Sequence, residues 1–373
     1  MFLKGLLNRK KRIETKNRNR LLREVNSNYR YTVEEYLLNK FAENKARPAS
    51  HPFVPDSFIL FNYLKIFALF NESNLGDYIQ TISVKKALES LYGQDLKFEQ
   101  FDRDNLFYYK RQDGASANPP VCVMQGWFSH TFAFLPNKDI LPVYVGSHLT
   151  RAVQNFVINL LALDPRYFAG FEVGCRDLST LDFCRRFKIG SYFSRCLTLT
   201  LPRRKDDPKN GRIFIVDMPD KLLRIIPKSI RANAVSIPQK ALKLSGEIED
   251  ELIRSACGLL ERFKSEASLV ITTALHCASP CIAMGIPVVL IAENPDENMK
   301  RFSSLDGILR IYTKEDLEGR KVDWNPSAID LEDLKSAMLR NLDLSIRKNC
   351  GQEIDLRDLA AARDFISTFN ILK

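Results

Sequence analysis

The sequence predicts an α/β protein made of two successive domains, each a parallel sheet covered by helices. Two observations support this fold class. The chain has 373 residues, more than one ordinary hydrophobic core accommodates, which indicates two domains of about 150 residues each. Short apolar runs also alternate with helical stretches, as in βαβ units, and the polar segment 202–211 interrupts this alternation once.

The overall composition is that of a globular protein, with 45% hydrophobic and 27% charged residues. It excludes disordered and fibrous classes. The longest apolar runs, residues 58–70 and 281–292, are shorter than the roughly 20 residues of a membrane span. Charges follow closely on the first residues, so we expect no secretory signal. We therefore expect a cytoplasmic protein whose eight cysteines are reduced. Cys277 and Cys281 have few possible partner ligands nearby, and we expect them to pack rather than to bind a metal.

The positive charge of the chain is concentrated at its beginning. Residues 1–30 contain ten Lys and Arg against two Glu, which accounts for eight of the ten net positive charges. Together with Phe2 and several leucines, this arm has the composition of a segment that lies on an anionic membrane surface. We expect it to hold the protein at the inner face of the cytoplasmic membrane; a solvated tail without a partner is the alternative. Nucleic-acid binding is not expected, since no second basic face or aromatic platform follows.

The first predicted domain covers residues 57–203, after the arm and a proline-containing linker that together occupy residues 1–56. Its expected strands are residues 63–70, 96–101, 121–127, 141–146 and 169–173. Its expected helices are residues 77–91, 149–163 and 178–187. The segment Cys196-Leu-Thr-Leu-Thr-Leu alternates with a period of two residues, which predicts a last strand.

The second predicted domain covers residues 204–328, and residues 329–373 form the C-terminal helices. The expected strands are residues 212–217, 234–237, 269–273 and 288–291. The expected helices are residues 247–264, 276–284, 331–347 and 356–369, with Asp330 at the N-cap of the third. Two Rossmann-like domains followed by helices indicate a glycosyltransferase-B-like arrangement. In such a fold the active site lies in the cleft between the domains, outside the carboxyl ends of the strands.

The most informative segment is residues 269–290, in which a buried strand passes directly into a helix. His276 lies near the N-terminus of that helix, where free backbone N–H groups and the helix dipole favour an anion. Gly285 and Pro287 end the helix and begin the next strand. This position favours a functional rather than a structural role for His276.

Other candidates occupy similar strand-to-helix turns. Asp77 follows Gly76 at the start of a helix, and the pair Arg176-Asp177 opens another. Helix capping and ion pairing are the structural alternatives for these residues. His130 follows a Gly-Trp turn, whereas we expect His148, at a strand end, to be structural. We regard Asp102-Arg-Asp104 as a chance occurrence of a metal–nucleotide motif that belongs to another architecture.

Several of these segments together resemble the polysaccharide pyruvyl transferase family, in the branch found among capsule and O-antigen genes. The similar segments lie between about residues 65 and 310. They are Asn74-Leu-Gly76-Asp77, Gln125-Gly-Trp127-Phe, Arg176-Asp177-Leu-Ser-Thr180, the stretch from Tyr192 to Leu201, and Thr273-Ala274-Leu275-His276 followed by Gly285-Ile-Pro-Val.

The resemblance implies a transferase that moves a pyruvyl group from phosphoenolpyruvate to a sugar of a lipid-linked glycan, without a metal or cofactor. Formation of a ketal needs cations for the phosphate and carboxylate, an acid for the enol carbon and a base for the sugar hydroxyls. On this basis we expect three groups of site residues. They are catalytic His276, Asp77 and Asp177; donor-binding Arg176, Arg195, Thr273, Arg301 and Gly76; and acceptor-binding His130, Trp127 and Glu293.

One position departs from the family pattern. The family has an arginine two residues before the histidine, where this chain has Ala274, and in pyruvyl-transferring members that arginine is implicated in binding phosphoenolpyruvate. Arg176, Arg195 or Arg301 can take its place, or the donor is a nucleotide sugar and the protein a glycosyltransferase. A third hypothesis is a non-catalytic partner of a polysaccharide assembly complex.

Overall fold

The computed structural model describes residues 35–372, except 66–67, 69–72, 113–116, 130 and 240–247. Residues 1–30, to which we assigned membrane binding, and His130 lie outside the described residues. Within them the protein is a mixed α/β structure with three sheets in which all the paired strands run parallel. The alternation of apolar runs and helical stretches therefore predicted the fold class correctly. None of the described helices is both long and apolar enough to cross a membrane.

The first sheet has the strand order β2-β1-β3-β5. Its strands are β1 (Ser57–Asn62), β2 (Lys97–Asp102), β3 (Val121–Val123) and β5 (Leu141–Val143). Helix α3 (Leu75–Tyr92) connects β1 to β2, and the 3₁₀ helix η1 (Arg103–Tyr108) follows β2 directly. The carboxyl ends of these strands therefore lie beside the start of α3.

The second sheet has the strand order β4-β6-β7-β8. Its strands are β4 (Gly126–Phe128), β6 (Ser147–Leu149), β7 (Val173–Cys175) and β8 (Ser191–Phe193), with η2 (Phe132–Phe134), α4 (Arg151–Leu163) and α5 (Leu178–Arg186) between them. We predicted one strand each at 121–127 and 141–146. The first run divides between β3 and β4, which lie in different sheets, and the second contains only β5. The chain enters the second sheet after Gln125 and again after Gly146, whose φ of +78° favours glycine.

The third sheet has the strand order β10-β9-β11-β12-β13. This order is doubly wound, because β10 is added on one side of β9 and β11, β12 and β13 follow on the other side. Its strands are β9 (Arg212–Val216), β10 (Ala234–Ile237), β11 (Ala267–Thr272), β12 (Val288–Ile291) and β13 (Ile311–Tyr312). The helices of this part are α6 (Asp220–Leu223), α7 (Lys228–Arg231), α8 (Ile248–Glu266), α9 (Leu275–Ala283), α10 (Pro295–Phe302) and α11 (Lys314–Glu318), with η4 (Ser303–Leu305) after α10.

Both faces of the third sheet are buried, which explains its continuous apolar strands. Ile271 and Val289 belong to one hydrophobic cluster, whereas their neighbours Val270 and Leu290 belong to the other. The cluster that contains Val270 and Leu290 also contains the core of the first two sheets, so a single hydrophobic core joins the two parts of the molecule.

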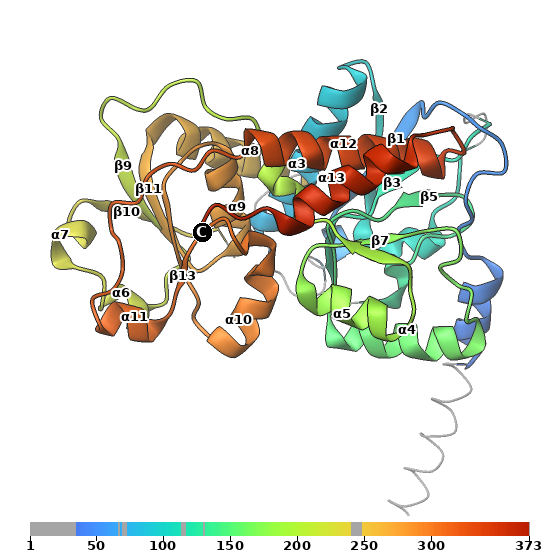
Figure 1. The fold of residues 1–373 in the computed structure, drawn as a ribbon, viewed down its shortest axis with the longest axis horizontal. Coiled ribbons are helices and arrows are strands. Elements are labelled where there is room, and N and C mark those ends of the chain that lie inside the picture. Colours follow the sequence, from blue (N-terminus) through green and yellow to red (C-terminus); the bar gives the residue numbers. More distant parts are fainter. Residues whose placement is uncertain are drawn as a thin grey trace, which may run out of the picture.

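The last two helices return to the first part of the chain. Helix α12 (Glu332–Asn349) contacts α3 and β5, and α13 (Leu356–Thr368) packs on α12 and contacts β8. In Figure 1 both helices, drawn in red, run from the third sheet across to the first two. Both were predicted from the sequence. Leu331 rather than Asp330 is the N-cap of α12, although Oδ1 of Asp330 accepts a hydrogen bond from the Glu332 amide at 3.0 Å.

Three predicted strands were wrong. The strand expected at 169–173 shares only Val173 with β7. The first strand is Ser57–Asn62, which precedes the predicted 63–70, and residues 64–65 are already helical. The alternating segment 196–201 forms the 3₁₀ helix η3 (Leu197–Thr200), not a strand. All four residues of η3 are buried, so the alternation does not separate a core face from a solvent face. Thr200 Oγ1 also donates to the Leu197 carbonyl at 2.8 Å, a local bond that competes with strand pairing.

Candidate active site

A buried arginine and a histidine from different parts of the chain meet at the proposed site. Arg176 stands between β7 and α5, and His276 lies in the first turn of α9. The Arg176 Nη1 atom lies 3.3 Å from Nε2 of His276. Arg176 is fully buried, whereas His276 is partly exposed. The two turns that the sequence singled out therefore form one site.

The start of α3 forms a third side of this site. Asn74 caps the helix by accepting a hydrogen bond from the Gly76 amide at 3.0 Å, and the Leu75 amide donates to the Gln239 carbonyl at 3.0 Å. A Cβ atom on Gly76 would lie 2.7 Å from Nε2 of Gln239 and 3.0 Å from Cβ of His276. Glycine is therefore required for the close approach of α3 to the turn that carries His276.

The N-terminus of α9 has no side-chain cap, because its N-cap residue is Ala274. The turn before it is held by Thr272 Oγ1, which accepts from the Ala274 amide at 3.0 Å, and by Thr273 Oγ1, which donates to the Asp217 carbonyl at 2.9 Å. The first N–H groups of a helix have no partner within the helix. Their partial positive charge and the Arg176 guanidinium together favour an anion beside His276.

The imidazole of His276 is neutral. Burial, and then the charges of Arg176, Arg301 and His148, lower its pKa well below the usual range. A guanidinium can only donate hydrogen bonds, so Nε2 of His276 accepts from Arg176 and the ring proton is on Nδ1. Once Arg176 turns to another partner, Nε2 is a base.

Asp177 lies behind Arg176 and is fully buried. As the N-cap of α5, its Oδ1 accepts from the Thr180 amide and hydroxyl, both at 3.0 Å, and its Oδ2 lies 2.5 Å from Nδ1 of His148. Burial alone would raise the pKa of Asp177, but the hydrogen bond from His148 and the charges of His148 and Arg176 bring it below the usual value. Asp177 is therefore a carboxylate whose two oxygens are already engaged.

Asp77 follows Gly76 in the first turn of α3 and is partly exposed. Its Oδ1 accepts a hydrogen bond from Nε2 of Gln80 at 3.1 Å. Its backbone carbonyl accepts from the hydroxyl of Tyr63 at 2.9 Å, which fixes this turn to the end of β1. Asp77 thus follows Gly76, the residue that approaches His276, while its carboxylate interacts with Gln80 and with the buried Arg103.

The family of the protein is settled by comparison with known proteins. The family model described as polysaccharide pyruvyl transferase matches residues 74–295, more than half of the chain and the part that contains Asp77, Arg176 and His276. The chain belongs to the polysaccharide pyruvyl transferase family. It is accordingly an enzyme, a transferase.

The solved structures and curated proteins add little to this assignment. A crystal structure of an uncharacterized protein from Klebsiella pneumoniae subsp. pneumoniae NTUH-K2044 is 13% identical and is covered over 92% of its length by 73% of this chain, with a TM-score of 0.34. The search of curated proteins gave no match.

The other predicted site residues of this pyruvyl transferase family member differ in their surroundings. Arg301, on α10, is exposed, and its charge contributes to lowering the pKa of both His276 and His148. Trp127 is half-buried on β4 and stands opposite His148 in the pairing of β4 with β6. Glu293 forms an ion pair with Lys221, 2.9 Å between Oε1 and Nζ.

Arg195 is engaged away from the Arg176–His276 contact. It is buried, and its guanidinium donates to four backbone carbonyls at 2.8–3.1 Å, those of Ile366, Ser304, Asp306 and Phe369. Burial lowers its pKa to about 10. Its φ of +57° places it in the left-handed region, just before the turn of η3. Arg195 therefore fastens α13 and η4 to the second sheet.

Two residues of the site were not predicted from the sequence. His148 was considered structural, yet it contacts Asp177 directly. Gln239 was not considered, yet it is 1% exposed and its side chain faces Gly76. His148 is the middle residue of β6 and Gln239 lies two residues after the end of β10, so no common sequence signal marks them.

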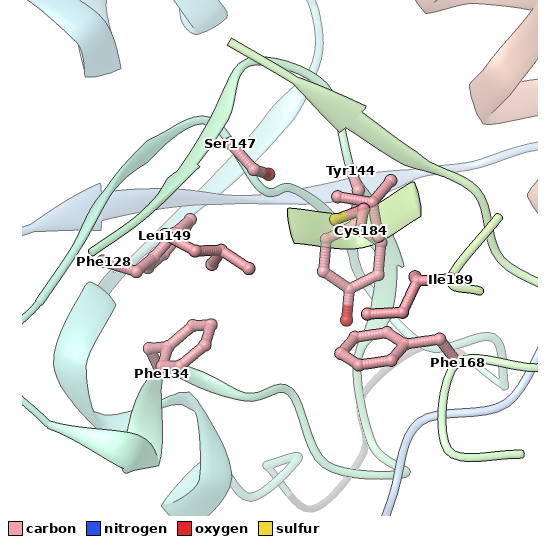
Figure 2. A pocket seen from close by; sticks show the side chains of 9 residues that line it. Phe128, Phe134, Tyr144, Ser147, Leu149, Phe168, Cys184 and Ile189 are labelled. Carbon is pink, nitrogen blue, oxygen red and sulfur yellow. The ribbon is translucent and has the colours of Figure 1, made fainter. Parts of the chain in front are cut away.

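One cavity in the described structure lies outside this site. It is apolar, with a volume of about 10 Å³ available to the centre of a water molecule, and Figure 2 shows Phe128, Phe134, Leu149 and Phe168 around it. A space of this size holds about one water molecule, and we interpret it as a packing defect of the second sheet. The described residues contain no group of three or more His, Cys, Asp or Glu that could hold a metal ion.

Proposed function

We propose that the protein transfers the pyruvyl group of phosphoenolpyruvate to two hydroxyls of one sugar in a lipid-linked precursor of a surface polysaccharide. The observation that carries this proposal is the contact of the buried Arg176 with the neutral His276 at an uncapped helix N-terminus. It combines a cation for an anionic donor with a base for the acceptor in one place.

The reaction joins both acceptor oxygens to C2 of the donor and breaks the bond from C2 to the phosphate oxygen. One hydroxyl proton goes to C3, which becomes a methyl group, and the other leaves with the phosphate, so atoms and charges balance. We assign the removal of one hydroxyl proton to Nε2 of His276, which is freed when the donor draws Arg176 away. We assign the transfer of the second proton to Asp77.

Arg176 and Arg301 are the cations that we assign to the donor. They replace the arginine that the family pattern has at Ala274, and they are joined by the N–H groups at the start of α9 and by Gly76 and Thr273. We no longer assign Arg195 to the donor, because backbone carbonyls occupy its guanidinium. Since Asp177 has no free oxygen, we assign it to the support of Arg176 rather than to proton transfer.

The architecture that fits this assignment is glycosyltransferase-B-like. We propose Rossmann-like halves at residues 57–203 and 204–328, with residues 329–373 as C-terminal helices. The doubly wound order of the third sheet and the position of Arg176 and His276 in different halves support this arrangement. The acceptor would enter past Trp127, Glu293 and His130, and residues 1–30 would hold the enzyme at the inner membrane surface.

A direct assay tests the proposal. The full-length protein is incubated with phosphoenolpyruvate and a lipid-linked saccharide fraction from the source cells, and phosphate release and pyruvate ketal are measured. We expect both in the wild type and neither in Arg176→Gln. Ketal formation without dependence on Arg176 would contradict our assignment of the donor site, and its absence with the authentic acceptor would refute the function.

Ala274 supports one alternative, a glycosyltransferase that binds the pyrophosphate of a nucleotide sugar at the N-terminus of α9. Thermal-shift measurements distinguish the two donors, because a ligand that binds only the folded state raises the melting temperature. Stabilisation by UDP, GDP or CMP sugars and not by phosphoenolpyruvate would favour the alternative. Ala274→Arg should increase affinity for phosphoenolpyruvate if our main proposal is correct.

A further inference from the structure

The carboxylate of Asp177 is shared among three neighbours inside the protein. Its Oδ1 accepts two hydrogen bonds from Thr180, and its Oδ2 lies 2.5 Å from Nδ1 of His148. Nε of Arg176 is third, at 3.6 Å from Oδ2. His148, Arg176 and Asp177 are all at most 5% exposed. Water therefore competes little for the hydrogen bonds and the ion pair among these three side chains.

Arg176 is consequently a buried cation whose hydrogen bonds are incomplete. The 3.6 Å separation exceeds a hydrogen-bond length, and Nε of Arg176 has no hydrogen-bond partner among the described residues. A buried guanidinium next to a carboxylate usually forms two short parallel hydrogen bonds with it. Here His148 and Thr180 occupy the oxygens that such a pair would use. Because Asp177 is ionised, His148 Nδ1 is the donor in their hydrogen bond.

We propose that His148 is a positioning residue that keeps Asp177 from pairing with Arg176, so that the guanidinium stays turned toward His276 and available to an anionic donor. The availability of Arg176 to a donor rests on the proposed function. The orientation of Arg176 toward His276 does not, because it holds in the protein without any ligand.

Replacement of His148 then has two separate consequences. Without the Nδ1–H donor, Oδ2 of Asp177 is free to form a short ion pair with Arg176. Arg176 would leave His276, and its lowering effect on the pKa of His276 would weaken. A donor anion would also have to break the new ion pair, which we expect to weaken binding by about tenfold, or about 1.4 kcal/mol.

The test compares two substitutions of His148 in the full-length protein. His148→Phe keeps the ring volume and removes the donor, whereas His148→Asn places an N–H near the position of Nδ1. His148→Leu takes the place of the Phe variant if that variant does not fold, and His51→Leu, at an exposed histidine in the linker, is the matched control. The pKa of His276 is measured by NMR titration without ligand, and the dissociation constant of phosphoenolpyruvate by calorimetry.

We expect the pKa of His276 to rise more in His148→Phe than in His148→Asn, because both variants lose the smaller direct effect of the His148 charge. The dissociation constant should increase about tenfold in His148→Phe but not in His148→Asn, and His51→Leu should change neither quantity. An unchanged pKa of His276 in folded His148→Phe or His148→Leu overturns the proposal, as does an equal rise in His148→Asn. If phosphoenolpyruvate binds to none of the proteins while the pKa of His276 still responds, the proposed function fails and the positioning role of His148 stands.

Discussion

Nη1 of Arg176 lies 3.3 Å from Nε2 of His276, although 100 residues separate them in the sequence. This contact predicts that His276→Ala abolishes turnover and leaves the fold intact, because His276 is partly exposed and stands at the edge of the core. Phosphate release and the melting temperature are the measurements. A large fall in melting temperature, with activity per folded molecule preserved, would show that His276 is structural.

The stability of the protein should decrease in mild acid. The pKa values of His276 and His148 are both lowered in the folded state, chiefly by burial, so the unfolded chain binds more protons below its histidine pKa of about 6.5. The free energy of unfolding should fall as the pH drops through 6.5, by at most about 1.4 kcal/mol per pH unit for each histidine. Denaturant unfolding between pH 8 and 5.5 measures this slope. It should be smaller in His276→Ala.

Gly76→Ala should disrupt the site more than an ordinary Gly-to-Ala substitution does. The added Cβ would be 2.7 Å from the Gln239 side chain and 3.0 Å from Cβ of His276, so the Gln239 amide must turn away and the turn that carries His276 must shift by a few tenths of an ångström. We expect activity to fall at least tenfold. Gly258→Ala is the control, because a Cβ there meets nothing within 4 Å and should stabilise α8 by up to about 1 kcal/mol. Equal activities of the two variants would contradict the proposed contact.

Asp77→Asn should lower the catalytic rate far more than it lowers stability. A partly exposed charge in the first turn of a helix contributes at most about 1 kcal/mol, and asparagine can still accept from Gln80. Steady-state kinetics and thermal unfolding of the same preparation separate the two effects. Normal turnover would make Asp77 a helix-end residue only.

Arg195→Met should lower the stability of the protein and leave donor binding unchanged, the opposite of Asp77→Asn. It leaves backbone carbonyls of η4 and the C-terminal region without their donors, so we expect the free energy of unfolding to fall by on the order of 3 kcal/mol. Affinity for phosphoenolpyruvate, corrected for the folded fraction, should not change. A selective loss of donor affinity at unchanged stability would return Arg195 to the donor site.

Deletion of residues 1–30 should release the protein from anionic vesicles and leave activity on a short soluble acceptor unchanged. These residues carry most of the net positive charge, and each basic residue adds about 1 kcal/mol at an anionic surface. Sedimentation with vesicles at low and high salt measures the effect, since salt screens the attraction. Sedimentation of the truncated protein at low salt would assign the contact to the folded body.

The sequence predicted some elements closely, among them the fully buried strand β12, and misplaced others. β10 and β12 have the predicted bounds, and α12 and α13 agree within two residues. The segment 196–201 failed because η3 is buried on all sides, so its period of two carries no information about a sheet. Asp77, Arg176 and His276 could be found because each opens a helix. The role of His148 depends on β6 lying beside β7, a relationship that only the tertiary structure supplies.

Helices α12 and α13 come last in the chain but pack on the first two sheets. A single cut within residues 202–211 would divide the polypeptide, yet the C-terminal fragment would still hold the helices that cover the N-terminal one. The two fragments would then be partners in a non-covalent heterodimer, with Arg176 contributed by one and His276 by the other. In that sense the candidate site is an interface between two parts of one chain.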